Sequence, residues 1–377
     1  MDNQPPHTVA ATIEKIAPRL STALVSREAR ARLERIAGAL PASLTDWIYL
    51  ECRLRRDDHR VDLITRVDER GRDVLTGENP MIRLTTAPHA APVWNRIRAL
   101  ARSWSDASSP LFRAIERLWL EFDIPASLDE RDNGALPAPG VFVEFARESY
   151  AQHRRDGRLD AAMSALRLLI GGALASETAR NLRRCWELLP SSAVIPYVGV
   201  FPARGTDAVR VSVAGLSERE LPAYLRALRW PGSQRDLANA IAAFLPRSPA
   251  PQPRLAIVNL DVHQGIGAAV GLEYILSHAA QSRGRLLERA LLERLVRLGA
   301  CSAATAEALR GWPMISHDIM PHELWRSRVC RRVNHLKLCI AERAPIEVKA
   351  YLSLSHEYRP ARHDVTRPAV RLQHSTR

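Results

Sequence analysis

The residues best suited to chemistry in this 377-residue chain recur at every second position of short apolar segments. Successive side chains of a β-strand point to opposite faces, so these residues would share one face of a strand. They are Tyr49, Glu51 and Arg53; Trp119, Glu121 and Asp123; His335, Lys337 and Cys339; and Glu347, Lys349, Tyr351 and Ser353. Carboxylates, cations and aromatic rings on one face could bind an anionic group, shield a carbocation and move a proton.

Charge and cysteine content argue against several other kinds of site. The formal net charge is +13, but among the 54 Lys and Arg residues the only lysines are Lys15, Lys337 and Lys349. The arginines are interspersed with acidic residues, as on solvated helix faces, so we expect no nucleic-acid partner. The five cysteines are scattered without a CxxC pair and are expected to be buried free thiols.

Two local motifs each have a functional and a structural interpretation. Gly265–Gly271 has a GxGxxxG pattern after a predicted strand, which indicates either a dinucleotide-binding turn or a glycine-rich hairpin turn. No βαβ series surrounds it, which favours the hairpin. His317, His322 and Glu323 lack the spacing of zinc motifs, and a loop leading into a helix N-terminus is the alternative to a metal site. No P-loop, kinase or nucleophile-elbow motif is present.

Helices and paired strands alternate along the chain and would position the polar residues. The predicted strand pairs are 47–55 with 60–67, 117–124 with 141–145, 194–202 with 208–215, 254–262 with 269–274, and 333–340 with 346–354. The predicted helices are 26–39, 91–104, 158–173, 218–228, 234–246 and 285–298.

Internal similarity indicates a domain built by duplication. Strand–turn–strand segments that start at Tyr49, Tyr197 and Leu336 align without gaps. They share an arginine near the turn and a valine that opens the return strand: Arg56, Arg204 and Arg343; Val61, Val209 and Val348. A second pair of segments, from Trp119 and from Ile257, has the same order of strand, loop, strand and long helix.

The organisation that we predict is one domain over residues 26–356, after a helical lead-in over 1–25. Residues 357–377 lack hydrophobic periodicity and are expected to be disordered, and 123–140 form a Pro-, Asp- and Gly-rich loop. No run of 18 apolar residues and no signal-peptide pattern occurs, so we expect a cytoplasmic protein without a membrane-spanning segment.

The apolar face of the predicted strands is the only large surface against which amphipathic helices can pack. The polar face is then either open to solvent, as in a one-sided sheet, or the inside of a closed barrel. Large aromatic residues are well suited to a binding cavity and poorly suited to bare solvent. Those on the polar face are Trp119, Phe142, Tyr197, Phe201 and Tyr351. The sequence therefore favours an α/β fold of repeated αββα units that form a roughly ten-stranded antiparallel barrel, with helices outside and a polar, aromatic lumen.

This layout resembles the ABBA, or PT-barrel, aromatic prenyltransferases over nearly the whole chain. Local patterns similar to that family are Glu51 on the first strand, Lys337 on the ninth and Lys349-x-Tyr351 on the tenth. The resemblance implies a transferase that moves an isoprenoid from its diphosphate to an aromatic small molecule or peptide side chain. It also implies that barrel cations hold the diphosphate and that a first-strand glutamate contacts the acceptor ring. No cofactor would be required.

The chemistry assigns roles to the lumen residues. Cations must stabilise the departing diphosphate, aromatic walls must shield the allylic cation, and a carboxylate must orient or deprotonate the acceptor. For diphosphate binding we predict Arg53, Arg66, Arg210, Lys337, Lys349 and Tyr351. For shielding and the substrate pocket we predict Trp119, Tyr197, Phe201 and His335, and for catalysis Glu51 and Glu121.

The sequence departs from the family pattern on the central strands. Where a Lys-x-Tyr pair is usual on strand four, this chain has Phe142-x-Glu144. The central lumen is acidic, with Glu121, Asp123, Glu144, Asp261 and Glu273. Mg²⁺ held by Asp123, Asp261 and Glu273 could bridge this cluster to a diphosphate, arginines could pair with it, or the substrate could be cationic. The alternative function is a non-catalytic binding or accessory protein of the same fold in peptide natural-product biosynthesis.

Overall fold

The computed structural model describes most of the chain. The described residues are 8–55, 60–79, 82, 84–124, 135–146, 155–244, 254–276, 289–319, 326–342 and 344–358. Within them, no helix is both long and apolar enough to cross a membrane.

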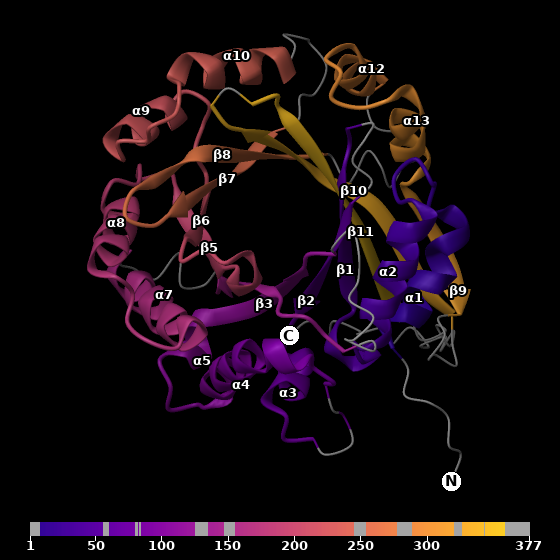
Figure 1. Ribbon diagram of the computed structural model, residues 1–377, viewed down its shortest axis with the longest axis horizontal. Coiled ribbons are helices and arrows are strands. Elements are labelled where there is room, and N and C mark those ends of the chain that lie inside the picture. Colours follow the sequence, from indigo (N-terminus) through magenta and orange to yellow (C-terminus); the bar gives the residue numbers. More distant parts are fainter. Residues whose placement is uncertain are drawn as a thin grey trace, which may run out of the picture.

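Ten antiparallel strands close into a barrel, and an eleventh extends it at one side. The strands are β1 Trp47–Arg53, β2 Val61–Val67, β3 Ile115–Phe122, β4 Gly140–Phe145, β5 Val194–Val200, β6 Val209–Ala214, β7 Arg254–Val262, β8 Ile266–Ile275, β9 Met314–Ile319, β10 Arg326–Ile340 and β11 Glu347–Tyr358. Their order is β11-β1-β2-β3-β4-β5-β6-β7-β8-β10-β9, and the additional pairing of β11 with β10 closes the ring. Figure 1 shows the strands as this ring, with the helices outside it. The predicted barrel fold is therefore confirmed.

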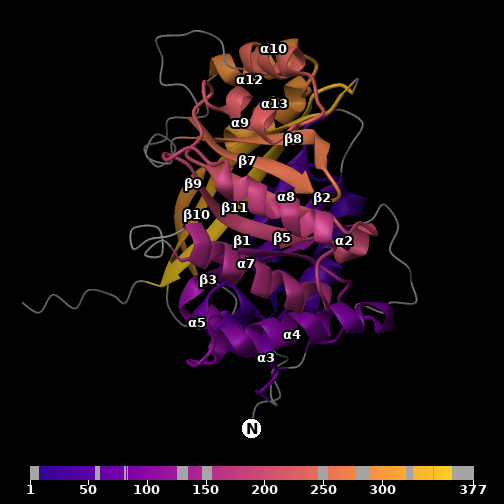
Figure 2. The same ribbon diagram turned by 90° about the vertical axis from the view of Figure 1, so that its left-hand side faces the viewer.

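Helices occupy the connections from one strand pair to the next. They are α1 Val9–Ile16, α2 Arg27–Gly38, α3 Glu69–Thr76, α4 Ala91–Ser105, α5 Leu111–Ala114, α7 Arg155–Ile170, α8 Ser176–Glu187, α9 Leu221–Ala227, α10 Gln234–Phe244, α12 Arg289–Arg297 and α13 Ala303–Gly311. Short 3₁₀ turns are η1 Ala17–Arg19, η2 Ala42–Leu44, η3 Pro88–Ala90 and η5 Pro202–Arg204. Figure 2, turned by 90°, shows α7, α8 and α4 lying over the outer surface of the strands.

The core lies between the helices and the outer face of the barrel. Ile48, Leu50 and Cys52 of β1 are buried there with the apolar sides of the helices. Their partners across the pairing with β11 are Leu354, Leu352 and Ala350, so each outward residue meets another outward residue. Because every second residue faces outward, the alternation that fills this core also sends the polar residues inward.

The two ends of the barrel differ in their connections. At the end called here the hairpin end, β1 is joined to β2, β3 to β4, β5 to β6, β7 to β8 and β10 to β11, and the described parts of these connections contain no α-helix. At the other, the helical end, helices link each pair to the next. The glycine-rich motif begins at Gly265 in the turn between β7 and β8 and continues into β8, which starts at Ile266, so the motif belongs to a hairpin as predicted.

Several predicted boundaries need correction. The last two strands are longer than predicted: the extension of β11 pairs with the first part of β10, and that part of β10 also pairs with β9, a strand that the sequence did not indicate. His317 lies on β9, so the predicted loop there is wrong, whereas His322 and Glu323 lie outside the described residues. Residues 357 and 358, predicted as the start of a disordered tail, belong to β11, and the rest of the tail lies outside the described residues.

Candidate functional site

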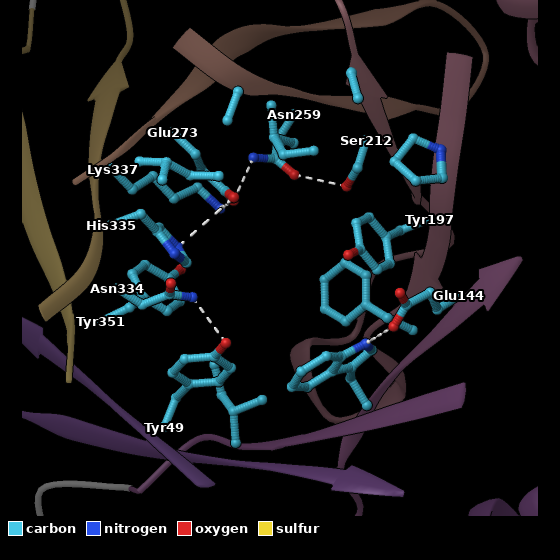
Figure 3. Close-up of a pocket in the computed structure, with 18 of the residues that line it drawn as sticks. Tyr49, Glu144, Tyr197, Ser212, Asn259, Glu273, Asn334, His335, Lys337 and Tyr351 are labelled. Carbon is cyan, nitrogen blue, oxygen red and sulfur yellow. Dashed lines mark hydrogen bonds and ion pairs between the residues drawn. The ribbon is translucent and has the colours of Figure 1, made fainter. Parts of the chain in front are cut away.

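The lumen contains a cavity of about 390 Å³ that lies mainly toward the helical end. Its lining residues are Tyr49, Ile64, Trp119, Glu121, Phe142, Glu144, Val194, Pro196, Tyr197, Ser212, Ala214, Ala256, Ile257, Asn259, Glu273, Ile275, Asn334, His335, Lys337 and Tyr351. In Figure 3, Glu273, Lys337 and His335 lie on one wall and Tyr197 and Glu144 on the opposite wall. The volume falls within the range of small-molecule sites.

Aromatic rings form much of this wall. The Tyr49 and Trp119 rings stack with centroids 5.5 Å apart, and His335 stacks on Tyr351 at 3.9 Å. Phe142 contributes a further ring. Such faces attract cations and exclude water, so the cavity could hold an aromatic ligand or shield a carbocation.

Glycines on the lumen face make room for these side chains. A Cβ on Gly199 would lie 2.6 Å from the Phe142 ring, and one on Gly271 would lie 2.7 Å from the Lys337 Cε atom. The glycines on β5 and β8 therefore determine where one ring and one ammonium can lie. Sequence alternation alone shows only that these positions face inward.

A chain of hydrogen bonds crosses the wall formed by β6, β7 and β8. The Ser212 hydroxyl donates to Asn259 Oδ1 over 2.7 Å, and Asn259 Nδ2 donates to Glu273 Oε1 over 2.7 Å. Lys337 Nζ and His335 Nε2 each lie 3.6 Å from Glu273. Glu273 therefore lies close to polar groups of Asn259, Lys337 and His335 on this wall. Lys337 borders the cavity, so an anion bound there could replace Glu273 as its partner.

Glu144 is the corresponding carboxylate on the opposite wall. Trp119 Nε1 donates to it over 2.8 Å, and Arg117 Nη1 donates over 3.1 Å. Burial raises the pKa of Glu144 from its ordinary value, although both donors oppose that effect. The Trp119 indole is thereby fixed edge-on to the carboxylate with its face available to Tyr49.

Glu51 itself does not line the cavity and is held by residues of β11. Lys349 Nζ donates to its Oε1 over 2.6 Å, and the Tyr351 hydroxyl donates to its Oε2 in a short hydrogen bond. Glu51 is 2% exposed and is absent from the cavity lining, whereas Tyr351 lines it. Burial alone would raise the pKa of Glu51, but Lys349, Lys337 and these hydrogen bonds outweigh it and hold the pKa well below its ordinary range.

An arginine from the β5–β6 turn closes a second network at the hairpin end. Arg204 Nη2 lies 2.5 Å from Glu121 Oε1, while Arg204 Nε and Nη2 donate to Asp123 over 2.7 and 2.6 Å. Its guanidinium lies 3.7 Å from the centroid of the Phe201 ring. Glu121 also lines the cavity, and burial with the nearby charge of Glu51 raises its pKa to about 7 despite Arg204.

The other cations predicted for diphosphate binding are also paired. Arg53 Nη1 lies 2.9 Å from Asp62 Oδ2, and Arg210 makes two hydrogen bonds to Asp261 of 2.6 and 2.9 Å. Arg66 extends toward the helical end, where it pairs with Asp46 at 2.7 Å and lies over the Trp47 ring. All three lie outside the cavity lining.

The acidic residues predicted as a magnesium site do not form a common group. Asp123 binds Arg204, Asp261 binds Arg210, and Glu273 accepts from Asn259. Among the residues that the structure describes, no three His, Cys, Asp or Glu side chains are arranged to hold a metal ion. Basic and amide partners hold these three side chains in separate contacts, and the magnesium site stays a prediction.

The sequence-predicted residues thus divide between two regions of the lumen. Glu121, Trp119, Tyr197, His335, Lys337, Tyr351 and Glu273 line the cavity. Glu51, Arg53, Arg66, Arg210, Lys349, Phe201, Asp123 and Asp261 do not. Sequence reasoning assigned no role to Tyr49 or Arg204. Alternation along β1 and the turn arginine shared by the repeated segments were the signals that could have identified them.

Comparisons with known proteins concern the fold. No protein-family model matches the chain, and no curated protein matches it in sequence. The solved structures of 5-dimethylallyltryptophan synthase from Streptomyces coelicolor and of the prenyltransferase PriB are each 14% identical to it, with TM-scores of 0.48 and 0.46. The first comparison covers 92% of this chain and 98% of that one, the second 91% and 94%. AnaPT from Neosartorya fischeri is 10% identical, with a TM-score of 0.47 and coverage of 91% and 90%. The strand order and register of this chain establish, on their own, that it has the barrel architecture expected from the resemblance to ABBA prenyltransferases.

Proposed function

We propose that this protein is an aromatic prenyltransferase-like enzyme that transfers an isoprenoid from its diphosphate to an aromatic small molecule or peptide side chain. The observation that carries the proposal is the closed barrel with an aromatic-walled cavity of about 390 Å³ at one end and lumen cations at the other. The allylic group would lie among the rings, with its diphosphate toward the hairpin end. Acceptor and donor would then meet in a space from which the walls exclude water.

Diphosphate binding would require the cations to exchange partners. Lys337 already borders the cavity at 3.6 Å from Glu273, and Lys349, Arg53 and Arg210 lie beyond it on the lumen face. Burial raises the pKa of Asp62 to about 6, so protonation of this carboxyl at or below about pH 6 would release Arg53 from part of its pairing. A preorganised cation is the group that stabilises the charge developing on the leaving diphosphate.

The reaction itself breaks the bond between the allylic C1 and the diphosphate oxygen and forms a bond from C1 to the acceptor ring. The electron pair of the broken bond leaves with the diphosphate, and the ring loses a proton to a carboxylate. Trp119, Tyr49 and Tyr351 would face the cation through their rings. Glu51 and Glu121 are the carboxylates that the sequence assigns to the proton.

The experiment combines purified protein with dimethylallyl or geranyl diphosphate and with tryptophan or related indoles, and detects products by mass. Calorimetry with inorganic diphosphate, with and without Mg²⁺, measures the donor site separately, because Mg²⁺ could bridge the diphosphate to lumen carboxylates. Lys337→Ala should weaken diphosphate binding by about tenfold or more, and Lys15→Ala, on α1 outside the barrel, is the matched control. Absence of diphosphate binding under both conditions would rule out the transferase.

A second candidate is a non-catalytic binding or accessory protein of the same fold. It is favoured by the carboxylate partners of Arg53, Arg66, Arg210 and Lys349, which leave these cations already neutralised. In that case an aromatic ligand binds in the cavity, diphosphate does not, and Lys349→Ala leaves ligand binding unchanged. The same calorimetric titrations therefore separate the two functions.

A further inference from the structure

We propose that Glu121, and not the first-strand Glu51, accepts the proton from the acceptor ring, and that Arg204 is the positioning residue that holds Glu121 for this role. The inference rests on the proposed transfer reaction and identifies the base within it. The two carboxylates differ in what they contact. Glu121 lines the cavity, whereas Glu51 is separated from it by Tyr351.

Each oxygen of Glu51 already accepts a hydrogen bond from the protein. Its Oε2 accepts from Tyr351, which faces it across the pairing of β1 with β11, and its Oε1 accepts from Lys349, two residues earlier on β11. A carboxylate held this strongly in its ionised form is a weak base, because a proton added to it must displace an ammonium partner. Glu51 therefore orients Tyr351 and neutralises Lys349 without touching the acceptor.

Arg204 binds Glu121 and Asp123 through one guanidinium group. Its Nη2 atom contacts Oε1 of Glu121 and Oδ1 of Asp123, and its Nε contacts Oδ2 of Asp123. The bidentate contact with Asp123 fixes the plane of the guanidinium, and Phe201 supports its face at 3.7 Å. Arg204 can therefore hold the Glu121 carboxylate ionised and fix its direction at the edge of the cavity.

Charged groups approach Glu121 from every side of the lumen. Glu51 on β1 and Asp123 just beyond β3 oppose its ionisation, while Arg204, Lys337 on β10 and Arg210 on β6 favour it. Burial is the largest effect and also disfavours ionisation of Glu121. Together these effects raise the pKa of Glu121 to about 7, which suits a base that works near neutral pH. Among these groups Arg204 is the one in direct contact with it at 2.5 Å.

The proton step balances without any added reactant. After C1 of the allylic group bonds to the ring, the ring carbon carries a hydrogen that must leave for aromaticity to return. That proton goes to the free oxygen of Glu121, and the C–H electron pair returns to the ring. Glu121 becomes neutral, and the departing diphosphate retains the negative charge.

The first experiment compares Glu121→Gln with Glu51→Gln in the transfer assay. Loss of the base should lower kcat by about 100-fold or more in Glu121→Gln, within the usual range for general acid–base catalysis. Glu51→Gln leaves Lys349 buried without its charge partner and could unfold the barrel, so a second variant, Glu51→Gln with Lys349→Met, removes the whole pair. The activity that remains in this double variant should still show an acidic limb in its kcat profile near pH 7, because Glu121 is intact, whereas the residual activity of Glu121→Gln should lack that limb. Loss of the limb in the double variant with its retention in Glu121→Gln would overturn the assignment.

The second experiment tests Arg204 by two substitutions with opposite expected signs. Arg204→Gln removes the cation that favours ionisation, so the acidic limb of the kcat profile should move to higher pH. Asp123→Asn removes an opposing negative charge, so the same limb should move to lower pH. Arg204→Lys should restore most of the wild-type position. A general loss of structure would not produce shifts of opposite sign.

A direct titration makes the result independent of turnover. Side-chain carboxyl NMR of the wild type, assigned by comparison with Glu121→Gln, should show one glutamate that titrates near pH 7. Its midpoint should rise in Arg204→Gln and fall in Asp123→Asn. A midpoint that is ordinary or unchanged in both variants overturns the role of Arg204. If the titration behaves as expected but no donor is ever transferred, then the proposed function fails and the Arg204–Glu121 linkage stands.

Discussion

The most direct prediction of the proposed function is that diphosphate competes with Glu273 for Lys337. Lys337 is 7% exposed, and its Nζ lies 3.6 Å from Glu273. At an effective dielectric constant of about 20, two unit charges at this distance attract by about 5 kcal/mol, so Glu273 is a strong competitor for any incoming anion. Substitution of Glu273 by Gln removes that competitor and keeps an oxygen that can accept from Asn259.

The expected gain is smaller than the raw attraction, because Glu273 stays near Lys337 when diphosphate binds, and the substitution removes only the repulsion between the two anions. A diphosphate oxygen on Lys337 would lie about 7 Å from Glu273, where like charges repel by roughly 2 kcal/mol before screening. Relief of this repulsion should therefore tighten diphosphate binding by about 1–2 kcal/mol, a factor of about 5 to 30 in Kd. Isothermal titration with inorganic diphosphate at constant ionic strength measures it.

Glu187→Gln provides a control with the same change in charge. Glu187 is exposed at the end of α8, outside the barrel, and its replacement should leave Kd unchanged because salt screens a distant surface charge. Unchanged or weaker binding in Glu273→Gln, with the barrel still folded by circular dichroism, would refute the placement of the diphosphate at Lys337.

Three further predictions concern the walls of the lumen. Glu51→Gln and Lys349→Met should each lower the free energy of unfolding by about 3 kcal/mol, whereas the double variant should lose far less. Urea denaturation measures these losses, and additive losses in the double variant would contradict a buried ion pair. Gly199→Val should push the Phe142 ring into the cavity and weaken binding of indoles by about tenfold, measured by tryptophan fluorescence, whereas unchanged affinity would place the ligand elsewhere. Burial raises the folded-state pKa of Asp62 to about 6, so the folded protein binds this proton more tightly and should lose about 3 kcal/mol of stability as pH rises from 4 to 7. Asp62→Asn should remove that part of the pH dependence in thermal unfolding.

Much of the fold could be predicted because alternation along the strands is strong. In β11, Val348, Ala350 and Leu352 face the helices while Lys349 and Tyr351 face the lumen, and a shift by one residue would reverse both faces. This one pattern, repeated with helices between the strand pairs, was enough to favour a barrel.

The extension by β9 could not be predicted in the same way. Its sequence, MISHDI, has no clear apolar face, and among the described strands β9 lies at the edge of the sheet and pairs with β10 alone. The strand exists because β10 continues past β8 and needs a partner, which is a property of the whole sheet.

The site was predicted in its composition but not in its pairing. Alternation places Arg210 and Asp261 on the lumen face, yet only the register of β6 against β7 makes them direct neighbours. The same holds for Glu51, whose partners lie about 300 positions later in the chain. Burial of Glu51 away from the cavity therefore followed from long-range register, which no local pattern records.

The closure of the first strand on the last has a consequence for how the protein is made. Lys349 and Glu51 are separated by 298 positions, so the ring cannot close until almost the whole chain has left the ribosome. Until then β1 presents an unpaired edge with Glu51 lacking its ammonium partner, a state prone to aggregation. Such distant pairing predicts slow folding, and loss of the β11 segment would leave an open sheet with two exposed edges in place of a barrel.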